Sequence, residues 1–144
     1  MIKNRKYSYN YIIEKEYVAG IELRGTEVKS LRDGRANITE AFIYIKDNEC
    51  FIKNSYIDKQ KNSPYLNHEE TRERKLLLKK REIYDLHEYV KTSGYTIVPI
   101  EIFLSKNIFK IRIGIGKGKK NYDKRDSIKT KDLKRSDDRL RKIK

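Results

Sequence analysis

The apolar residues of this chain are concentrated in its first part, which limits where a folded core can form. Residues 117–144 carry 13 of the 35 basic residues, 5 of the 21 acidic residues and +8 of the net charge of +14. Their apolar residues are only Tyr122, Ile128, Leu133, Leu140 and Ile143. So few apolar side chains cannot offset the entropy of ordering a chain. We therefore predict a folded domain over residues 1–116 and a basic tail, residues 117–144, that is disordered when free.

The composition favours a polyanionic partner. The sequence pI is about 9.7, and the chain has 11 Tyr and no Trp. Lys and Arg neutralise phosphates, and tyrosine rings can stack on bases. We therefore expect the protein to bind nucleic acid. The alternative is a basic surface that is simply well solvated.

Cysteine content and the N-terminal sequence bear on the cellular compartment. Cys50 is the single cysteine, so the chain cannot form an internal disulfide. The first residues, MIKNRKYSYNY, lack the apolar run of a signal peptide, and no apolar stretch approaches the roughly 18 residues of a membrane span. We expect a cytoplasmic protein that does not enter a membrane.

The first regular segments are predicted as a strand and a short helix. From Tyr11 to Leu23 apolar residues occupy mostly the odd positions, which indicates a half-buried strand with a bend or bulge at Gly20. Residues Thr26–Arg32 are predicted to form a helix that Thr26 caps and Gly34 ends.

Two hairpins are predicted from runs rich in aromatic and β-branched residues. The first joins Ala41–Lys46 to Cys50–Ile57 at Asp47-Asn48-Glu49. The second joins Tyr95–Leu104 to Ile108–Gly116, with a bulge or sheet edge at Pro99.

The segment between the hairpins has a different pattern. Residues 58–68 are polar and are predicted to form an exposed loop. From Glu70 to Thr92 apolar residues recur at about 3.6 positions, which predicts one or two helices ending near Ser93-Gly94. The whole pattern favours a mainly β fold: a small antiparallel OB-like β-barrel with flanking α-helices.

No catalytic or metal-binding motif is complete. His68-Glu69-Glu70 begins like a zinc-protease helix, but Arg72 occupies the position of the second histidine. The alternating Gly114, Gly116 and Gly118 fit neither phosphate-loop pattern, and we interpret them as a close approach to RNA or a flexible exit from the barrel. We expect a non-enzyme with no catalytic residues, no metal and no cofactor. The enzyme alternative is a basic nuclease that uses carboxylates with Mg²⁺.

Four strings together carry a resemblance to a known family. They are Asn4-Arg5-Lys6, AGIELRGTEVKSLRDGRANI over 19–38, NHEETRERKLLLKKREI over 67–83, and GKGKKNYDKR over 116–125. In order and spacing they resemble the SsrA-binding protein (SmpB) family over essentially the whole chain. The resemblance implies an OB-type barrel and a bacterial, non-enzymatic protein, expected to be monomeric, that binds transfer-messenger RNA (tmRNA, also called SsrA RNA). It also implies delivery of that RNA to ribosomes stalled on messages without a stop codon.

The resemblance implies roles for particular residues. The barrel would bind the tRNA-like part of tmRNA, and the tail would enter the empty mRNA channel near the decoding centre of the small subunit. The alternative is a general OB-fold tRNA or ribosomal RNA-binding protein with a nonspecific basic tail. The implied RNA-binding residues are Asn4, Arg5, Lys6, Lys29, Arg32, Asn37, Arg74, Lys75, Lys119 and Lys120. The implied ribosome-contacting residues of the tail are Tyr122, Asp123, Lys124 and Arg125.

Two positions depart from the usual family pattern. Val18 stands where many members have a glutamate, so a polar contact to the RNA elbow made there in relatives is not expected here. Tyr122 stands where histidine is frequent, at a position implied to stack on a ribosomal RNA base. Tyrosine also stacks on bases, so that role is expected to survive the exchange.

Overall fold

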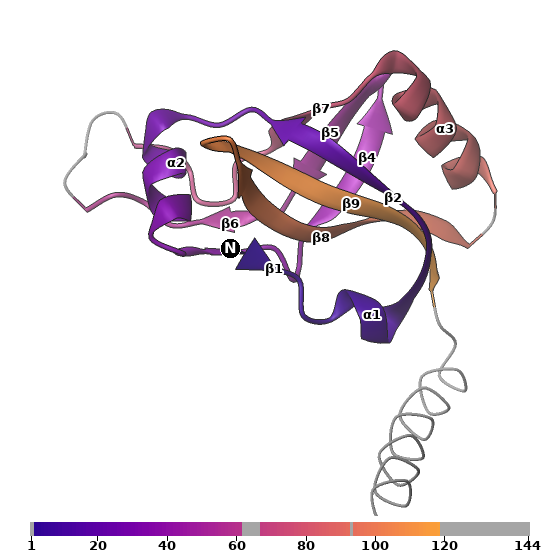
Figure 1. Cartoon of the computed structure of the whole chain (residues 1–144), viewed down its shortest axis with the longest axis horizontal. Coiled ribbons are helices and arrows are strands. Elements are labelled where there is room, and N and C mark those ends of the chain that lie inside the picture. Colours follow the sequence, from indigo (N-terminus) through magenta and orange to yellow (C-terminus); the bar gives the residue numbers. More distant parts are fainter. Residues whose placement is uncertain (1, 62–66, 93, 119–144) are drawn as a thin grey trace, which may run out of the picture.

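The computed structural model describes residues 2–61, 67–92 and 94–118 (Figure 1). In chain order the elements are β1 (Ile2–Lys3), α1 (Tyr7–Asn10), β2 (Tyr11–Ile21), α2 (Gly25–Arg32), β3 (Ala36–Asn37), β4 (Phe42–Lys46), β5 (Glu49–Lys53), β6 (Tyr56–Ile57), β7 (Arg74–Leu77), α3 (Lys80–Lys91), β8 (Tyr95–Ser105) and β9 (Ile108–Gly118).

The main sheet closes on itself to form a barrel. Its neighbouring strands are β8, β4, β5, β7, β2 and β9, and β9 pairs again with β8. All these pairs are antiparallel, and the junction of β4 with β8 is the short one, aligned at Ile43 and Ile97. β1 lies along the other part of β8, while β3 and β6 form a separate small sheet. The predicted mainly β, antiparallel barrel with flanking helices is confirmed.

The two hairpins turn where the sequence predicts. Asp47 and Asn48 have positive φ angles of 52° and 61°, and Lys106 and Asn107 have 50° and 64°. Two successive residues in the left-handed backbone region form a tight turn. The twist of this turn matches the twist of a pair of antiparallel strands. β9 continues to Gly118, so the predicted boundary between residues 116 and 117 falls inside this strand.

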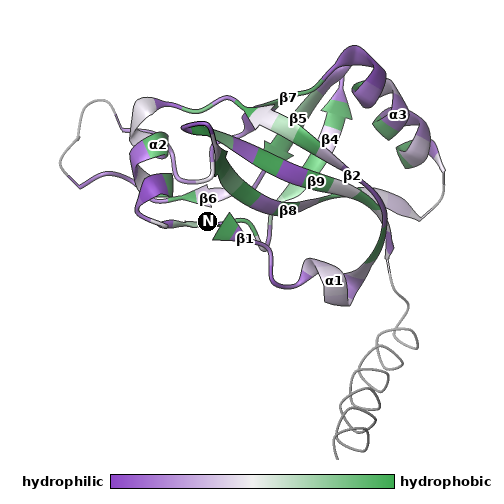
Figure 2. Ribbon diagram, in the orientation of Figure 1, coloured by the Kyte–Doolittle hydropathy of each residue, from purple (hydrophilic) through white to green (hydrophobic). Residues whose placement is uncertain are grey.

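The core fills the barrel and continues under both longer helices. Ile111, Ile113 and Ile115 alternate inward along β9, and Figure 2 shows the corresponding apolar bands along the strands. Leu31 of α2 and Leu86 of α3 are also buried. Figure 1 shows these two helices flanking the barrel at opposite ends. None of the helices in the described residues is long and apolar enough to cross a membrane.

The prediction of helix from Glu70 onward is wrong for its first part. Residues Arg74–Leu77 form β7, which lies between β5 and β2 and completes the barrel. Three consecutive leucines fit a helical face or a buried strand equally well, and the barrel's need for a strand decides the outcome. The helix begins only at Lys80, where the Glu82 side chain accepts the backbone N–H of Lys79 at 3.0 Å, and it ends before Gly94, as predicted.

The glycines of the strands serve close packing within the barrel. A Cβ on Gly114 would lie 2.9 Å from Ile13 Cγ2, and one on Gly116 would lie 2.9 Å from Ile13 Cδ1. These contacts occur where the pairing of β2 with β9 shifts register, between Ile13 and Lys15. Both glycines are buried, so our interpretation of a close approach to RNA is corrected for them. At Gly20 the pairing shows no register shift, and its missing side chain makes room for Leu77 instead.

The predicted irregularity at Pro99 is a bulge, and the N-terminal segment covers it. The register between β8 and β9 shifts between Pro99 and Glu101. Asn4 Nδ2 donates to the carbonyl of Pro99 at 2.8 Å, and the Asn4 backbone N–H donates to Ile100 at 2.8 Å. Asn4 Oδ1 in turn accepts the backbone N–H of Lys6 at 3.1 Å. The buried amide of Asn4 therefore fixes the segment that carries Arg5 and Lys6.

A buried carboxylate connects α2 to the strands around it. Glu27 is fully buried, and its Oε1 accepts hydrogen bonds from the Arg24 backbone N–H and from Arg72, each at 2.7 Å. Glu27 Oε2 accepts Nε of Arg74, which is also fully buried and donates further to Ser55. Burial alone would raise the pKa of Glu27, but these hydrogen bonds and the charge of Arg74 outweigh it and lower the pKa.

A buried histidine also bonds to the first turn of this helix. The buried His68 ring bonds the Ile57 carbonyl through Nε2 at 2.9 Å and the Thr26 hydroxyl through Nδ1 at 2.8 Å. Because a carbonyl only accepts, Nε2 carries the hydrogen. Thr26 does not cap α2, contrary to prediction: the helix begins at Gly25, and the Glu27 side chain satisfies the backbone N–H of its N-cap residue, Arg24. Gly34, with φ of 71°, follows the helix as predicted.

We expect Glu27→Gln to destabilise the fold by about 3 kcal/mol or more, because it leaves the buried Arg74 charge without a counter-ion.

The lowered pKa of Glu27 also predicts that the wild-type protein is sensitive to acid. The stability that the ionised Glu27 contributes is present above its ordinary pKa of 4.5 and is lost as the pH falls through the folded-state pKa. Urea denaturation from pH 7 to pH values below 4.5 measures both effects. Glu88→Gln, which removes the exposed pair with Lys91, is the control. Equal stability of the two variants would contradict this account.

Candidate nucleic-acid interface

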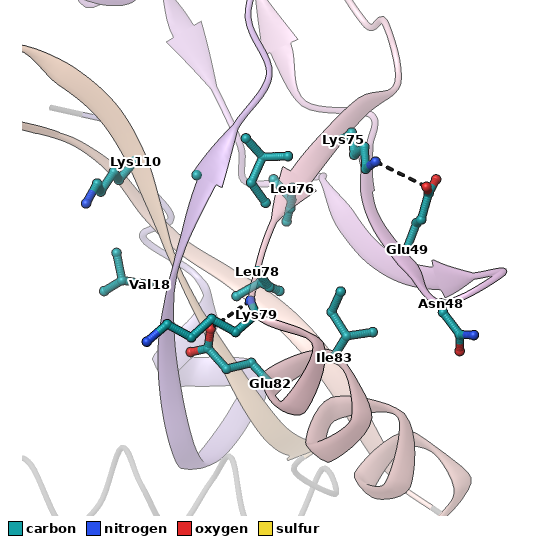
Figure 3. A pocket seen from close by; sticks show the side chains of 12 residues that line it. Val18, Asn48, Glu49, Lys75, Leu76, Leu78, Lys79, Glu82, Ile83 and Lys110 are labelled. Atoms are coloured by element: carbon teal, nitrogen blue, oxygen red, sulfur yellow. Dashed lines mark hydrogen bonds and ion pairs between the residues drawn. The ribbon is translucent and has the colours of Figure 1, made fainter.

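A groove lies on the outside of the barrel between β2, β7 and the start of α3. It has a volume of about 550 Å³. Its floor and walls are largely apolar, and Figure 3 shows the side chains that line it. Val18 and Leu77, which face outward from adjacent strands, are 45% and 49% exposed. The lining residues are Val18, Gly20, Asn48, Glu49, Lys75, Leu76, Leu77, Leu78, Lys79, Glu82, Ile83 and Lys110.

Lysines surround this groove. Lys75, Lys79 and Lys110 come from β7, from the residue before α3 and from β9. Lys75 Nζ lies 3.1 Å from Glu49 Oε1, whereas Lys79 and Lys110 make no ion pair with another described residue. Apolar walls suit the flat faces of bases and sugars, and the ammonium groups suit phosphates. The groove therefore has the chemistry of a nucleic-acid site.

Two positions singled out in the sequence meet in this groove. Lys75 is one of the predicted RNA-binding residues, and Val18 is one of the two positions noted above as departures from the expected family pattern. With valine there, the wall formed by β2 presents a methyl surface rather than a carboxylate. Apolar contacts to base faces or sugars are favoured over a directional polar contact at this position.

Other predicted residues gather around a second hollow. Arg5 and Asn37 line it together with Lys3 and Gly34, between the N-terminal segment and the turn after α2. Lys6 is exposed on the same N-terminal segment, and the exposed Lys29 and Arg32 lie on the last turns of α2. Figure 1 shows β1 and α2 away from α3 and hence from the groove.

Two predicted RNA-binding residues are corrected. Arg74 is fully buried, and its guanidinium is engaged by Glu27 and Ser55, so it offers no surface to RNA. In the helix that we predicted, Arg74 could lie beside Lys75 on the exposed face. In the strand β7, consecutive residues face opposite sides, so Arg74 points into the barrel while Lys75 points outward. Asn4 is also buried, with both ends of its amide occupied within the chain. Both residues position their neighbours instead.

The structure adds residues that the sequence reasoning missed. Lys79 and Lys110 line the groove, and Lys3 lines the second hollow. For Lys110 the signal was available, because it alternates with the inward Phe109 and Ile111 on a predicted strand. For Lys79 the signal was hidden, because we assigned it to the middle of a helical segment. The remaining predictions, Lys119, Lys120, Tyr122, Asp123, Lys124 and Arg125, lie outside the described residues.

Two observations bear on the catalytic alternatives. Burial raises the pKa of the Cys50 thiol to about 12, so it is not a thiolate nucleophile at neutral pH. In residues 2–61, 67–92 and 94–118, no group of three or more His, Cys, Asp or Glu side chains is placed to hold a metal ion. The nuclease hypothesis requires such a convergence of carboxylates.

Comparison with known proteins identifies the family. The sequence profile of the SmpB protein family matches residues 1–143. The chain belongs to the SmpB family. An SsrA-binding protein of Treponema denticola is 47% identical over 141 residues, which cover 98% of this chain and 92% of that protein. One from Fusobacterium nucleatum is 49% identical over 133 residues, covering 92% and 90%.

The fold agrees with that of an SmpB family structure. A chain of a solved structure described as "tmRNA-SmpB: a journey to the center of the bacterial ribosome" superposes with a TM-score of 0.70. It is 36% identical, and the match covers 88% of this chain and 92% of that chain. Family membership and the barrel architecture therefore rest on independent comparisons of sequence and structure.

Removing one groove lysine should weaken RNA binding, most strongly at low salt. We expect Lys79→Ala and Lys110→Ala each to reduce the slope of log affinity against log salt by about 1, because each removes one phosphate contact. Lys91→Ala is the matched control, since it removes the same charge at the far end of α3 and outside the groove. Slopes that stay at the wild-type value in both groove variants would contradict an RNA-binding groove.

Proposed function

We propose that this protein binds tmRNA and delivers it to stalled ribosomes for trans-translation, the rescue reaction that tags incomplete peptides. The observation that carries the proposal is the family match over residues 1–143, supported by relatives named SsrA-binding proteins and by the similarity to an SmpB chain described with the ribosome. The protein acts in the cytoplasm as an RNA-binding factor, without catalysis or cofactor. We infer that it is a monomer.

The barrel supplies the RNA-binding surface in this proposal. The groove bordered by Lys75, Lys79 and Lys110 holds a folded part of the tRNA-like domain. Cations position the phosphate backbone, while the apolar walls at Val18 and Leu77 contact sugars or bases that leave the helix stack. Recognition then depends on the shape of the folded RNA more than on its sequence.

The N-terminal hollow gives a second set of RNA contacts. Arg5 supplies a planar guanidinium for phosphate, and Asn37 supplies an amide that can pair with a base edge. Lys6, Lys29 and Arg32 extend the positive surface around it. In the tail, Lys119 and Lys120 add phosphate contacts, while the segment from Tyr122 to Arg125 reaches the decoding centre and the following residues enter the empty mRNA channel.

Competition decides between a tmRNA-specific protein and a general OB-fold RNA binder. We expect unlabelled tmRNA to displace labelled tmRNA from the protein at concentrations far below those needed for tRNA or for an unstructured RNA of equal length. Repeating the titration over a salt series separates counterion release from specific contacts. Equal displacement by all three RNAs would support the general binder and contradict our proposal.

The tail is predicted to act after tmRNA binding. We expect Tyr122→Ala to bind tmRNA normally but to reduce peptide tagging on ribosomes stalled at the end of a truncated message by about tenfold. Loss of one base stacked on one ring, worth about 1 to 3 kcal/mol, accounts for an effect of this size. Tyr122→Phe keeps the ring and should retain tagging. Tagging at the wild-type rate by Tyr122→Ala would remove the stacking role.

A further inference from the structure

The outer face of β4 and β5 carries a row of aromatic side chains that line neither the groove nor the second hollow. We name Phe42, Tyr44 and Phe51 the aromatic strip. The ring centroids of Phe42 and Tyr44 lie 6.3 Å apart, and those of Tyr44 and Phe51 lie 5.7 Å apart with a stacked geometry. Alternation along the two strands puts these rings outward, while Ile43 and Ile52 between them are buried in the barrel.

Stabilisation of the sheet accounts for two of the three aromatic rings but not for Phe42. Tyr44 and Phe51 are register partners, and such cross-strand aromatic pairs stabilise a sheet. Phe42 is different, because its register partner is Lys53 and its side chain is 45% exposed. A half-exposed ring beside the ring of Tyr44 can stack on a further flat apolar group.

Cations surround the strip. Lys53 lies across from Phe42, Lys75 lies across from Phe51 on β7, and Lys46 follows Tyr44 on the same face of β4. Glu49, the register partner of Lys46, forms an ion pair with Lys75. Aromatic faces bordered by lysines suit unpaired nucleotides, which present both a base ring and a phosphate. A neutral apolar protein segment would leave these ammonium groups without partners.

The strip is continuous with the groove. Lys75 and Glu49 line the groove, and Lys75 is the register partner of Phe51. An RNA held in the groove would therefore pass beside the strip as soon as its chain extends over β7 toward β5. Charge complementarity and this continuity both point to RNA as the occupant.

We propose that the aromatic strip is a stacking site for unpaired bases of RNA that leaves the groove across β7. The inference deepens the proposed function, on which it rests for the identity of the natural RNA. The stacking step does not depend on which RNA is bound: Phe42 stacks on a base, and Lys53, its register partner, contacts a flanking phosphate.

The test uses the full-length protein and a single-stranded RNA of about 12 nucleotides, within the site sizes of OB-type barrels. The RNA carries 2-aminopurine, a fluorescent base whose emission is quenched by stacking, and the absence of Trp from the chain keeps the background low. We expect Phe42→Ala to weaken binding at least about fivefold and to reduce the quenching. Phe42→Tyr, which keeps a stacking ring, should behave as the wild type.

Two controls isolate stacking from general effects. Ile108→Ala truncates another apolar side chain, 63% exposed at the start of β9, and should change neither affinity nor quenching. The same RNA annealed to its complement should bind Phe42→Ala as well as it binds the wild type, because paired bases are not free to stack on the protein. Thermal denaturation of each variant verifies that it is folded.

The possible outcomes separate the two proposals. Unchanged affinity and quenching for Phe42→Ala would overturn the stacking site even if competition shows tmRNA specificity. Loss of quenching without tmRNA specificity would retain the stacking site and remove the proposed function. Unchanged RNA binding together with lost binding to isolated ribosomal proteins would assign the strip to a protein partner and overturn the inference.

Discussion

The buried carboxylate of Glu27 is the interaction on which the arrangement of this protein depends. It receives bonds from the start of α2, from Arg72 in the segment before β7 and from Arg74 in β7 itself. Two parts of the chain far apart in sequence, the start of α2 and residues 72–74, therefore share one charge. Since an unpaired buried ion is costly, the pairing allows few alternative positions for α2 or β7. The groove is bounded by β7, so its shape is set by a contact on the opposite face of the strand.

The sequence was sufficient for those parts of the fold that depend on local pattern. Alternation located β2, β4, β5, β8 and β9, and turn-forming residues located Asp47-Asn48 and Lys106-Asn107. The short strand β7 was missed because its RKLLL string has no alternation of polar and apolar residues. Its strand conformation comes from long-range pairing with β5 and β2, which no local window contains.

The sequence predicted which kinds of residue form the candidate site, but not which individual residues are exposed there. Cations such as Arg5, Lys29 and Lys75 could be named from the family strings, but burial decides which polar residues remain available. Arg74 and Asn4 belong to the same strings and have structural partners instead. A motif therefore contains the residues that shape a surface as well as those that form it. The sequence does not distinguish these two kinds of residue, and the structure does.

The pairing of β9 has a mechanical consequence. This strand is hydrogen-bonded along nearly its whole length to β2 on one edge and β8 on the other, up to Lys117 and Gly118, where the described chain ends. A pull on the residues that follow would load both ladders in shear, so that many hydrogen bonds must break together rather than one after another. The barrel can therefore bear tension from the segment attached to it without unravelling from that end.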